Sequence, residues 1–157
     1  VNNRDAEIYG LEIAGQHFFG STGFGIGAAY TLVRGDVGFN IGASPSQDQF
    51  ALLGLSDTFN ATLIYDKNGL SARVAYNWRD KFLSGINRQG SRNPEFTEPF
   101  GQLDLNISYD ITPNFAVSFE GINLTEESLR TYARSKSQLW FAQELQRRFL
   151  LGGRFRF

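Results

Sequence analysis

The side chains that could carry chemistry are few and widely separated in this sequence. His17 is the single histidine and there is no cysteine, so one histidine and scattered carboxylates supply no metal-ligand set and no thiolate. A hydrolase would need a nucleophile and an acid partner close to His17, and no such set is evident. The glycine-rich stretch 23–27 lacks the spacing of a dinucleotide-binding loop. The sequence therefore predicts no enzyme, no metal site and no cofactor.

Composition narrows the class of protein further. The chain has 157 residues with 15 basic and 16 acidic side chains, so its formal charge of -1 provides no basic excess for binding nucleic acid. No run of about 18 apolar residues is present, which argues against a transmembrane helix. Transmembrane β-strands need only about 9–11 residues of alternating character, so a transmembrane β-barrel stays open.

Several stretches alternate between apolar and polar residues with the period of a β-strand. In the stretch 70–79, the even positions are Leu, Ala, Val, Tyr and Trp, whereas the odd positions are Ser, Arg, Ala, Asn and Arg. The stretch 58–66 alternates in the same way, and the turn-forming segment 66–69 separates the two. This pattern predicts an antiparallel hairpin with one apolar face.

The tight turns predict a register for three hairpins. Each expected pair joins two apolar residues on a common face, as antiparallel pairing requires. The expected pairs are Ile13 with Tyr30, Leu11 with Leu32, Tyr65 with Leu70, Leu63 with Ala72, Ala61 with Val74, Phe59 with Tyr76, Ile107 with Val117, and Leu105 with Phe119.

Short turns alternate with long polar connections along the chain. The long connections cover 34–56, 80–99 and 125–147. This alternation is typical of outer-membrane barrels, whose turns are short on the periplasmic side and long outside. Soluble sandwiches rarely sort their loops in this way. The expected strands are 5–19, 24–34, 57–66, 70–80, 100–110, 115–124 and 147–157.

The odd number of strands predicts that the chain is one part of a larger barrel. Bacterial barrels close with an even number of strands, and an open sheet would leave two unpaired edges in lipid. Further strands are therefore expected before Val1. The apolar positions also change parity at Gly121, which predicts a β-bulge or a strand end there.

Three segments resemble a known family. The segment GINLTEE at 121–127 resembles the N-L-T/F-D/N-E/K segment near the end of TonB-dependent receptors, and AEIYGLE at 6–12 is similar to their A-x-x-x-G-x-E strand. The ending FLLGGRFRF resembles the terminal strand that the barrel-assembly machinery recognises. The residues on its apolar face are Phe149, Leu151, Phe155 and Phe157. The chain thus resembles the C-terminal portion of the β-barrel of a TonB-dependent outer-membrane receptor.

The resemblance implies an all-β fold, an antiparallel up-and-down transmembrane β-barrel of which this chain forms about seven of 22 strands. Residues 1–157 would all belong to the barrel domain, with the plug domain and the TonB box outside this chain. The implied location is the bacterial outer membrane. The implied partners are lipid, the TonB complex through the plug, the assembly machinery, and a small-molecule or oligosaccharide substrate. The implied function is active import of a siderophore, cobalamin or oligosaccharide.

The polar positions of the strands predict a polar lumen wall. Candidates for contact with a plug or a substrate are Glu12, Arg73, Arg79, Asp104, Asn106 and Glu120. A solvated barrel interior would require the same residue types, because polar lumens are the rule. Arg73 and Asp104 lie on neighbouring expected strands and could form an ion pair.

Polar and aromatic residues of the long loops are further candidates for ligand contact. They are Asp48, Gln49, Trp140 and Phe141. The rings of Trp140 and Phe141 could stack on sugars or planar ligands, or could instead belong to the upper aromatic girdle at the lipid interface. Trp78 and Tyr76 are assigned to that girdle.

Other functions stay open at this level. A passive porin-like or small structural barrel would share the strand pattern, and an upstream plug domain would decide against it. A barrel-embedded hydrolase lacks its catalytic residues here. A soluble β-sandwich binding module would bury its apolar strand faces and would not need detergent.

Overall fold

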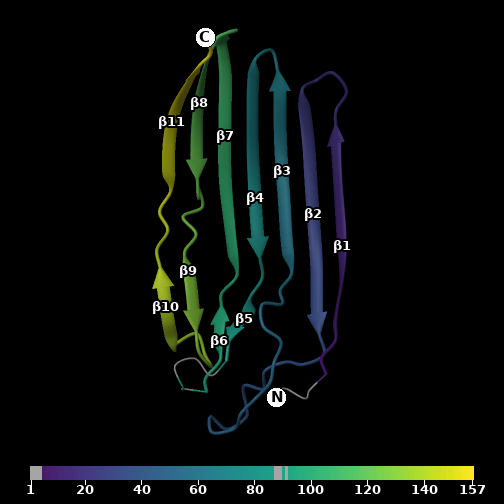
Figure 1. The fold of residues 1–157 in the computed structure, drawn as a ribbon, viewed down its shortest axis with the longest axis vertical. Coiled ribbons are helices and arrows are strands. Elements are labelled where there is room, and N and C mark those ends of the chain that lie inside the picture. Colours follow the sequence, from purple (N-terminus) through teal and green to yellow (C-terminus); the bar gives the residue numbers. More distant parts are fainter. Residues whose placement is uncertain (1–4, 87–89, 91) are drawn as a thin grey trace.

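The computed structural model describes residues 5–86, 90 and 92–157, and these residues form an all-β structure. The larger part is a seven-stranded antiparallel sheet in the order β1-β2-β3-β4-β7-β8-β11 (Figure 1). Its strands are β1 (Ile8–Phe18), β2 (Phe24–Gly35), β3 (Thr58–Lys67), β4 (Leu70–Arg79), β7 (Phe100–Thr112), β8 (Phe115–Ile122) and β11 (Arg148–Phe155). The sheet is open, with β1 and β11 at its two edges. The seven expected strands and their antiparallel order are confirmed.

The first hairpin has the register that the sequence predicts. Ile13 pairs with Tyr30, and Leu11 pairs with Leu32. The turn that follows β1 includes Gly20 in the left-handed backbone region, with φ of 56°. Glycine enters this region at no steric cost, so it permits the tight reversal.

The second hairpin is shifted by two residues from the predicted register. All four expected pairs are wrong by the same step, yet every apolar residue stays on its predicted face, because side chains alternate with a period of two. The observed pairs are Tyr65 with Ala72, Leu63 with Val74, Ala61 with Tyr76, and Phe59 with Trp78.

The cause of this shift is the length of the turn. The two strands continue as far as Lys67 and Leu70, which pair with each other, so the turn consists of Asn68 and Gly69 alone. Both turn residues are left-handed, with φ of 55° and 77°. This is the type I′ geometry that favours Asn-Gly in two-residue hairpins.

The third hairpin shows the same displacement. Ile107 pairs with Phe119 and Leu105 pairs with Gly121, so both expected partners are wrong. Strand β7 continues to Thr112, and an irregularity in the ladder directly before that residue absorbs the extra length. The strands are again longer, and the turn shorter, than the alternation alone suggests.

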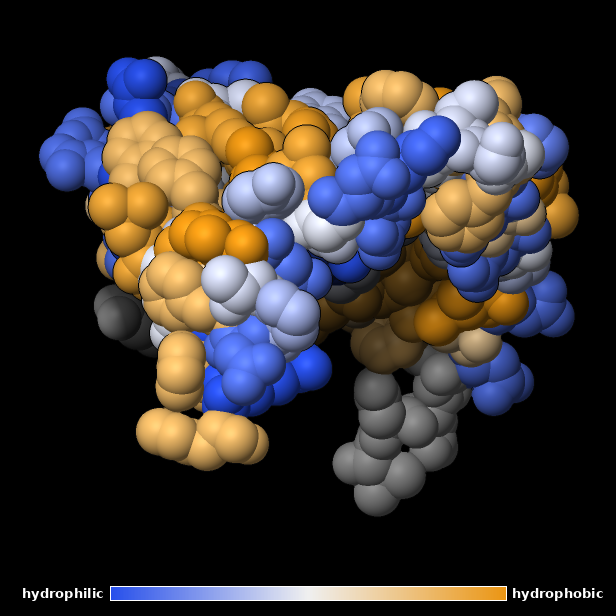
Figure 2. All heavy atoms as spheres, turned by 90° about the horizontal axis from the view of Figure 1, so that it is seen from above, coloured by the Kyte–Doolittle hydropathy of each residue, from blue (hydrophilic) through white to orange (hydrophobic). Residues whose placement is uncertain are grey.

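One face of the sheet is apolar and exposed. Leu63, Val74 and Leu105 form one row across β3, β4 and β7, and Leu63 is 57% exposed. Figure 2 looks along the strands and shows an arch, with hydrophobic side chains along much of its rounded outer side and a hollow on the opposite side. An exposed apolar face of this extent is what a barrel wall presents to lipid.

Two of the expected long loops contain a second sheet, in the order β10-β9-β6-β5. Its strands are β5 (Phe82–Gly85), β6 (Glu95–Thr97), β9 (Leu129–Tyr132) and β10 (Leu139–Gln143). The connections 80–99 and 125–147 are therefore partly strand, which the sequence pattern does not reveal.

The second sheet continues the first beyond a break at Pro99. Arg79 pairs with Phe100 and Phe82 pairs with Thr97, so β5 and β6 keep the antiparallel register of β4 and β7. Proline has no N–H to donate, which interrupts the ladder at this point. Figure 1 shows the short strands prolonging the long ones at the end away from the tight turns. The β-structure therefore extends into the connections 80–99 and 125–147, which the sequence pattern predicts as irregular loops.

The change of parity near Gly121 marks a strand end. Strand β8 ends at Ile122, and its pairing with β11 is regular through Ile122 and Arg148. Asn123 follows in the left-handed region with φ of 56°. Of the two expectations for this position, the strand end is confirmed, and the chain leaves the sheet through Asn123.

The connection between β2 and β3 folds back onto the sheets. Leu52 and Leu55 pack closely against Gly35, and a side chain at that position would have to displace the ends of both leucines. The ring of Phe96 contacts two other aromatic rings. Its centroid lies 6.5 Å from that of Phe39 and 5.7 Å from that of Tyr132. These contacts form a small core at the loop end of the molecule.

Candidate functional site

The polar face of the sheet brings together four of the residues that the sequence singles out. Arg73, Asp104, Asn106 and Glu120 line one hollow across β4, β7 and β8. Within it, Arg73 pairs with Asn106, and Asn106 pairs with Glu120. The row presents a cation, an amide and a carboxylate side by side. It can therefore exchange hydrogen bonds with polar solutes of either charge.

Asp104 has structural partners rather than the expected one. The register places Ala75 opposite Asp104. The Asp104 carboxylate accepts hydrogen bonds from Gln102 Nε2 at 2.8 Å and from the backbone N–H of Asn123 at 2.9 Å. The ion pair expected between Arg73 and Asp104 does not form within the described part of the chain. Asp104 thus supports the fold at the end of β8.

Two other predicted lumen residues lie apart from this row. Arg79 donates from Nε to Ser56 Oγ and from Nη2 to the Gly54 carbonyl, both at 2.7 Å. Its guanidinium carbon also lies 3.8 Å from the ring centroid of Phe82. Arg79 therefore fastens the connection that precedes β3. Glu12 lies on β1, at the far edge of the sheet.

Asn123 organises the segment that resembles the receptor family, a role that sequence reasoning missed. The residue is 3% exposed. Its Nδ2 donates to the carbonyls of Glu127 at 3.0 Å and Leu145 at 2.6 Å, and its Oδ1 accepts from the Glu127 backbone N–H at 2.9 Å. Asn123 therefore ties the exit of β8 to the segment that leads into β11. The parity change at Gly121 is the sequence signal closest to it.

Asp57 closes the ladder between β2 and β3 and was also not singled out from the sequence. Its carboxylate accepts hydrogen bonds from the Tyr30 hydroxyl at 2.9 Å and from the Val33 backbone N–H at 3.3 Å. Both terminal nitrogens of Arg34 donate to the same carboxylate. The Arg34 guanidinium, as the largest cause, lowers the pKa of Asp57 from 3.8 to about 2. Arg34 lies on β2 and Asp57 directly precedes β3, so the two are 23 residues apart and no local pattern in the sequence predicts the pair.

Arg134 joins two of the long connections. Its Nη1 donates to the carbonyls of Ile41 at 2.6 Å and Ala43 at 2.9 Å, while its Nε donates to Asn93 Oδ1 at 3.1 Å. The guanidinium carbon lies 5.9 Å from the ring centroid of Phe39. Arg134 thereby fixes the connection between β2 and β3 against the second sheet.

Trp140 and Phe141 lie on strand β10 rather than in an irregular loop. The register slips between Leu139 and Phe141, so Trp140 is an additional residue in the ladder. Both aromatic side chains line one hollow in the second sheet. Thr131 also lines it, is 5% exposed, and its Oγ1 has no hydrogen-bond partner among the described residues. An unpaired buried hydroxyl costs about 1–3 kcal/mol.

The other two loop candidates lie elsewhere. Asp48 forms an ion pair with Arg92, with 3.1 Å between Oδ1 and Nε. Gln49 accepts from the Asn40 backbone N–H at 2.8 Å and donates to the Asn40 carbonyl at 3.0 Å. Asp48 and Gln49 therefore order their own connection, and they do not share the hollow of Trp140 and Phe141.

The terminal strand presents the expected apolar face. Phe149 stacks on Phe119 with ring centroids 5.9 Å apart. Leu151 is 86% exposed. Phe155 ends the strand and contacts Phe157, with ring centroids 5.2 Å apart. This face continues the lipid-facing side of the sheet up to its last edge.

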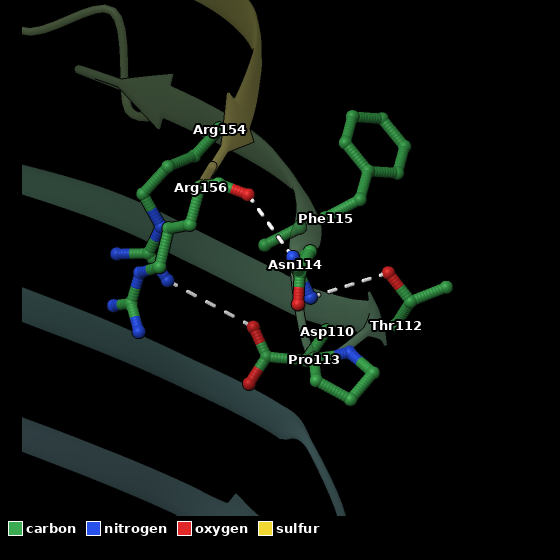
Figure 3. A pocket seen from close by; sticks show the side chains of 8 residues that line it. Asp110, Thr112, Pro113, Asn114, Phe115, Arg154 and Arg156 are labelled. Carbon is green, nitrogen blue, oxygen red and sulfur yellow. Dashed lines mark hydrogen bonds and ion pairs between the residues drawn. The ribbon is translucent and has the colours of Figure 1, made fainter.

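A polar hollow at the tight-turn end secures the terminal strand (Figure 3). Arg154 Nη2 lies 3.8 Å from Asp110 Oδ1. The Asn114 side-chain amide donates to the Arg156 carbonyl at 3.1 Å, and the Arg156 N–H donates to the Asn114 carbonyl at 2.9 Å. Figure 3 shows the side chains of Arg154 and Arg156 lying on the same side as Asp110. The contacts tie the end of β11 to the turn before β8.

The possible metal-ligating side chains stay apart from one another in the part of the chain that the structure describes. There, no three histidine or acidic side chains lie close enough together to hold a metal ion. The ring of His17 packs edge-on against Phe19, with centroids 4.8 Å apart. Among the described residues, no helix is long and apolar enough to cross a membrane.

Comparison with known protein families gives a match to most of the chain. The family described as "TonB dependent receptor-like, beta-barrel" matches residues 1–124, which is most of the chain and includes the wall residues Arg73, Asp104, Asn106 and Glu120. The match ends before the long connection to the terminal strand. No curated protein and no solved structure matches the chain. The family is one of transporters rather than enzymes, and its setting is the bacterial outer membrane. The chain therefore belongs to the TonB-dependent receptor β-barrel family and is part of an outer-membrane transport protein.

Proposed function

We propose that this chain forms the C-terminal part of the barrel of an active transporter that imports a scarce solute. The parent barrel would have 22 strands and an N-terminal plug, as the family resemblance implies. The open edges of β1 and β11 support this proposal, because a sheet in lipid must pair all its backbone groups. The solute is a siderophore, cobalamin or oligosaccharide.

The observation that carries the proposal is the two-faced wall. Leu63, Val74 and Leu105 form an apolar row on one side, and Leu63 in that row is exposed. On the other side, Arg73 and Glu120 lie in a single polar row. A solute path therefore runs along charged and amide groups while lipid contacts only hydrocarbon and aromatic groups. The terminal residues Phe149, Leu151, Phe155 and Phe157 would serve as the signal for the barrel-assembly machinery.

Uptake measurements test the proposal directly. The complete receptor is produced in a strain that lacks its own copy, and uptake of labelled siderophore, cobalamin and oligosaccharide is followed with and without TonB. We expect uptake of one solute that stops when TonB is deleted or the proton-motive force is collapsed. Uptake that continues in both cases would instead establish the passive porin-like alternative. A complete failure of uptake with a correctly assembled barrel would favour a structural role.

A further inference from the structure

The connection between β2 and β3 covers one face of the second sheet. Phe96 pairs with Tyr132, and the next pair in the ladder joins Thr97 to Thr131. Successive side chains on a strand point to opposite faces, so Phe96 and Tyr132 lie on the face opposite to the two threonines. Phe39 of the connection packs edge-on against Phe96. The connection therefore lies on the face of Phe96 and Tyr132.

The covered face is the lumen side of the wall. Trp78 lies on the lipid-facing side, so Phe82, four residues further along the same register, shares that side and Leu83 faces the lumen. Leu83 pairs with Phe96, and Lys81 Nζ lies 5.7 Å from the ring centroid of Phe96. The tight turns belong to the periplasmic side, so the second sheet lies at the extracellular end. The connection is therefore inside the extracellular mouth of the barrel.

The connection packs on the wall as a second layer. Leu83, Tyr132 and Ala133 of the wall are all buried, and so is Ala51 of the connection. A loop that projected into solvent would leave these apolar side chains exposed. Layers that pack face to face lie about 10 Å apart, so the connection narrows the lumen by roughly that distance on this side.

Arg134 holds the tip of the connection against the wall. Its Nη1 donates to the carbonyls of Ile41 and Ala43, which are 93 and 91 residues away along the chain. At the base of the connection, the Gly54 N–H donates to the Leu83 carbonyl of β5 at 2.9 Å. Both the tip and the base of the connection are therefore fixed to the second sheet.

We propose that residues 38–50, here named the ledge, limit the size of the solute that enters the lumen, and that Arg134 is the positioning residue that holds the ledge in place. The polar row of Arg73, Asn106 and Glu120 lies closer to the tight turns than the ledge does, so a solute from outside reaches the ledge first. A ledge fixed at its tip and base selects solutes by their dimensions before any group of that row contacts them. The proposal rests on the closed barrel of the proposed transporter and adds a size limit to it.

Labelling of a cysteine behind the ledge tests the size limit. The chain contains no cysteine, so Asn77→Cys supplies its single thiol, on the lumen face of β4 beside Arg73. Any cysteine upstream of this chain is replaced by serine. Cells that produce the complete receptor are treated with maleimides that carry no polymer, a short poly(ethylene glycol) chain or a long one. Ser137→Cys, in the exposed turn between β9 and β10, gives the rate of each reagent outside the ledge. Relative to Ser137→Cys, we expect labelling of Asn77→Cys to slow as the polymer lengthens.

Arg134→Ala should release the ledge. Labelling of Asn77→Cys by the longest reagent should then rise at least about tenfold, because the loss of one charged hydrogen bond already shifts an equilibrium by about that factor. Labelling by the reagent without polymer should stay unchanged, which a general loss of structure would not give. Lys136→Ala is the matched control, since it removes a cation from the same turn whose Nζ lies 3.7 Å from Glu98 Oε1 and does not bind the ledge. It should change neither rate.

A shortened connection carries the test if Arg134→Ala does not assemble. The Leu52 N–H donates to the Val37 carbonyl at 3.2 Å, so a short glycine-containing turn between these two residues can replace the ledge and its neighbour Ala51. This variant should give the same rise in labelling by the longest reagent.

The outcomes separate this proposal from the transport function. If the shortened connection leaves labelling by the longest reagent unchanged, the ledge does not limit access and the proposal is rejected. A rise with the shortened connection but not with Arg134→Ala would reject Arg134 as the positioning residue. Labelling requires neither TonB nor a transported solute, so TonB-dependent uptake would stand if the ledge proposal failed. A size limit without TonB-dependent uptake would support the ledge and reject active transport.

Discussion

Arg73 and Glu120 lie in one cross-strand row on the polar face of the barrel wall, with Asn106 between them. Neighbouring strands are about 4.8 Å apart, which separates the two Cα atoms by roughly 10 Å. No ion pair joins the two side chains within the described residues. The side chains of Arg73 and Glu120 therefore face the solvated lumen and do not pair with each other.

This arrangement predicts that the two charges matter for transport and little for stability. Arg73→Gln and Glu120→Gln should each change the free energy of unfolding by less than about 0.5 kcal/mol, because neither breaks a pair. Uptake of a charged solute should change in KM, in opposite directions for the two variants. Ser71→Ala, on the same face of β4, is the matched control and should change neither quantity. A large loss of stability in either charge variant would show that the row is structural.

Asn123 is expected to be the most sensitive polar residue of the chain. Asn123→Ala removes three hydrogen bonds in a buried site and places alanine in the left-handed region. The free energy of unfolding should fall by at least about 2 kcal/mol, since each orphaned partner costs about 1–3 kcal/mol. Chemical denaturation of the barrel in lipid vesicles measures the loss.

Two further variants separate the causes at Asn123. Asn123→Gly relieves the backbone strain but not the lost hydrogen bonds, so most of the destabilisation should persist. Asn68→Gly replaces a left-handed asparagine in an exposed turn and should be close to neutral. If the Asn123→Gly protein has the same free energy of unfolding as the unchanged protein, the side-chain hydrogen bonds of Asn123 do not contribute to stability.

The lowered pKa of Asp57 predicts that part of the protein's stability is lost in acid. Its folded pKa of about 2 lies below its ordinary value of 3.8. The lowered pKa means that the pairing with Arg34 stabilises the fold fully above the ordinary pKa and is lost as pH falls through about 2. The melting temperature of the receptor should therefore exceed that of Asp57→Asn near neutral pH, and the difference should shrink between about pH 4 and pH 2.

The control for this pH dependence is Asp48, which is paired with Arg92 on an exposed connection. Asp48→Asn should give a small difference at every pH, because exposed ion pairs contribute about 0–1 kcal/mol. A difference for Asp57→Asn that is independent of pH would mean that charge is not what the site requires.

The two faces of β3 should respond oppositely to a charge. Leu63→Arg places a cation on the lipid-facing row and should cost about 2–4 kcal/mol of unfolding free energy near the bilayer midplane. Thr62→Arg places the same side chain on the polar face of the same strand, where the cost should be below about 1 kcal/mol. Folding titrations in lipid vesicles compare the two. Equal costs would contradict the assignment of the faces.

The sequence by itself determines which face of each strand is apolar. Side chains alternate with a period of two, so the parity of Leu63, Val74 and Leu105 assigns their face without knowledge of any partner. The alternation also predicts seven strands and the strand end near Gly121, and all of these are confirmed. The same alternation of side chains places Arg73 and Glu120 on the polar face.

Only the tertiary structure decides which residues pair with and contact each other. Parity is unchanged by a shift of two residues, so it could not distinguish the predicted partner of Tyr65 from the observed Ala72. Strands β9 and β10 form in a segment with too few alternating residues to be recognised, because their pairing partners stabilise them. The Arg34–Asp57 pair and the hollow of Trp140 and Thr131 unite distant segments. Such contacts depend on how the strands are placed in space, which no local pattern encodes.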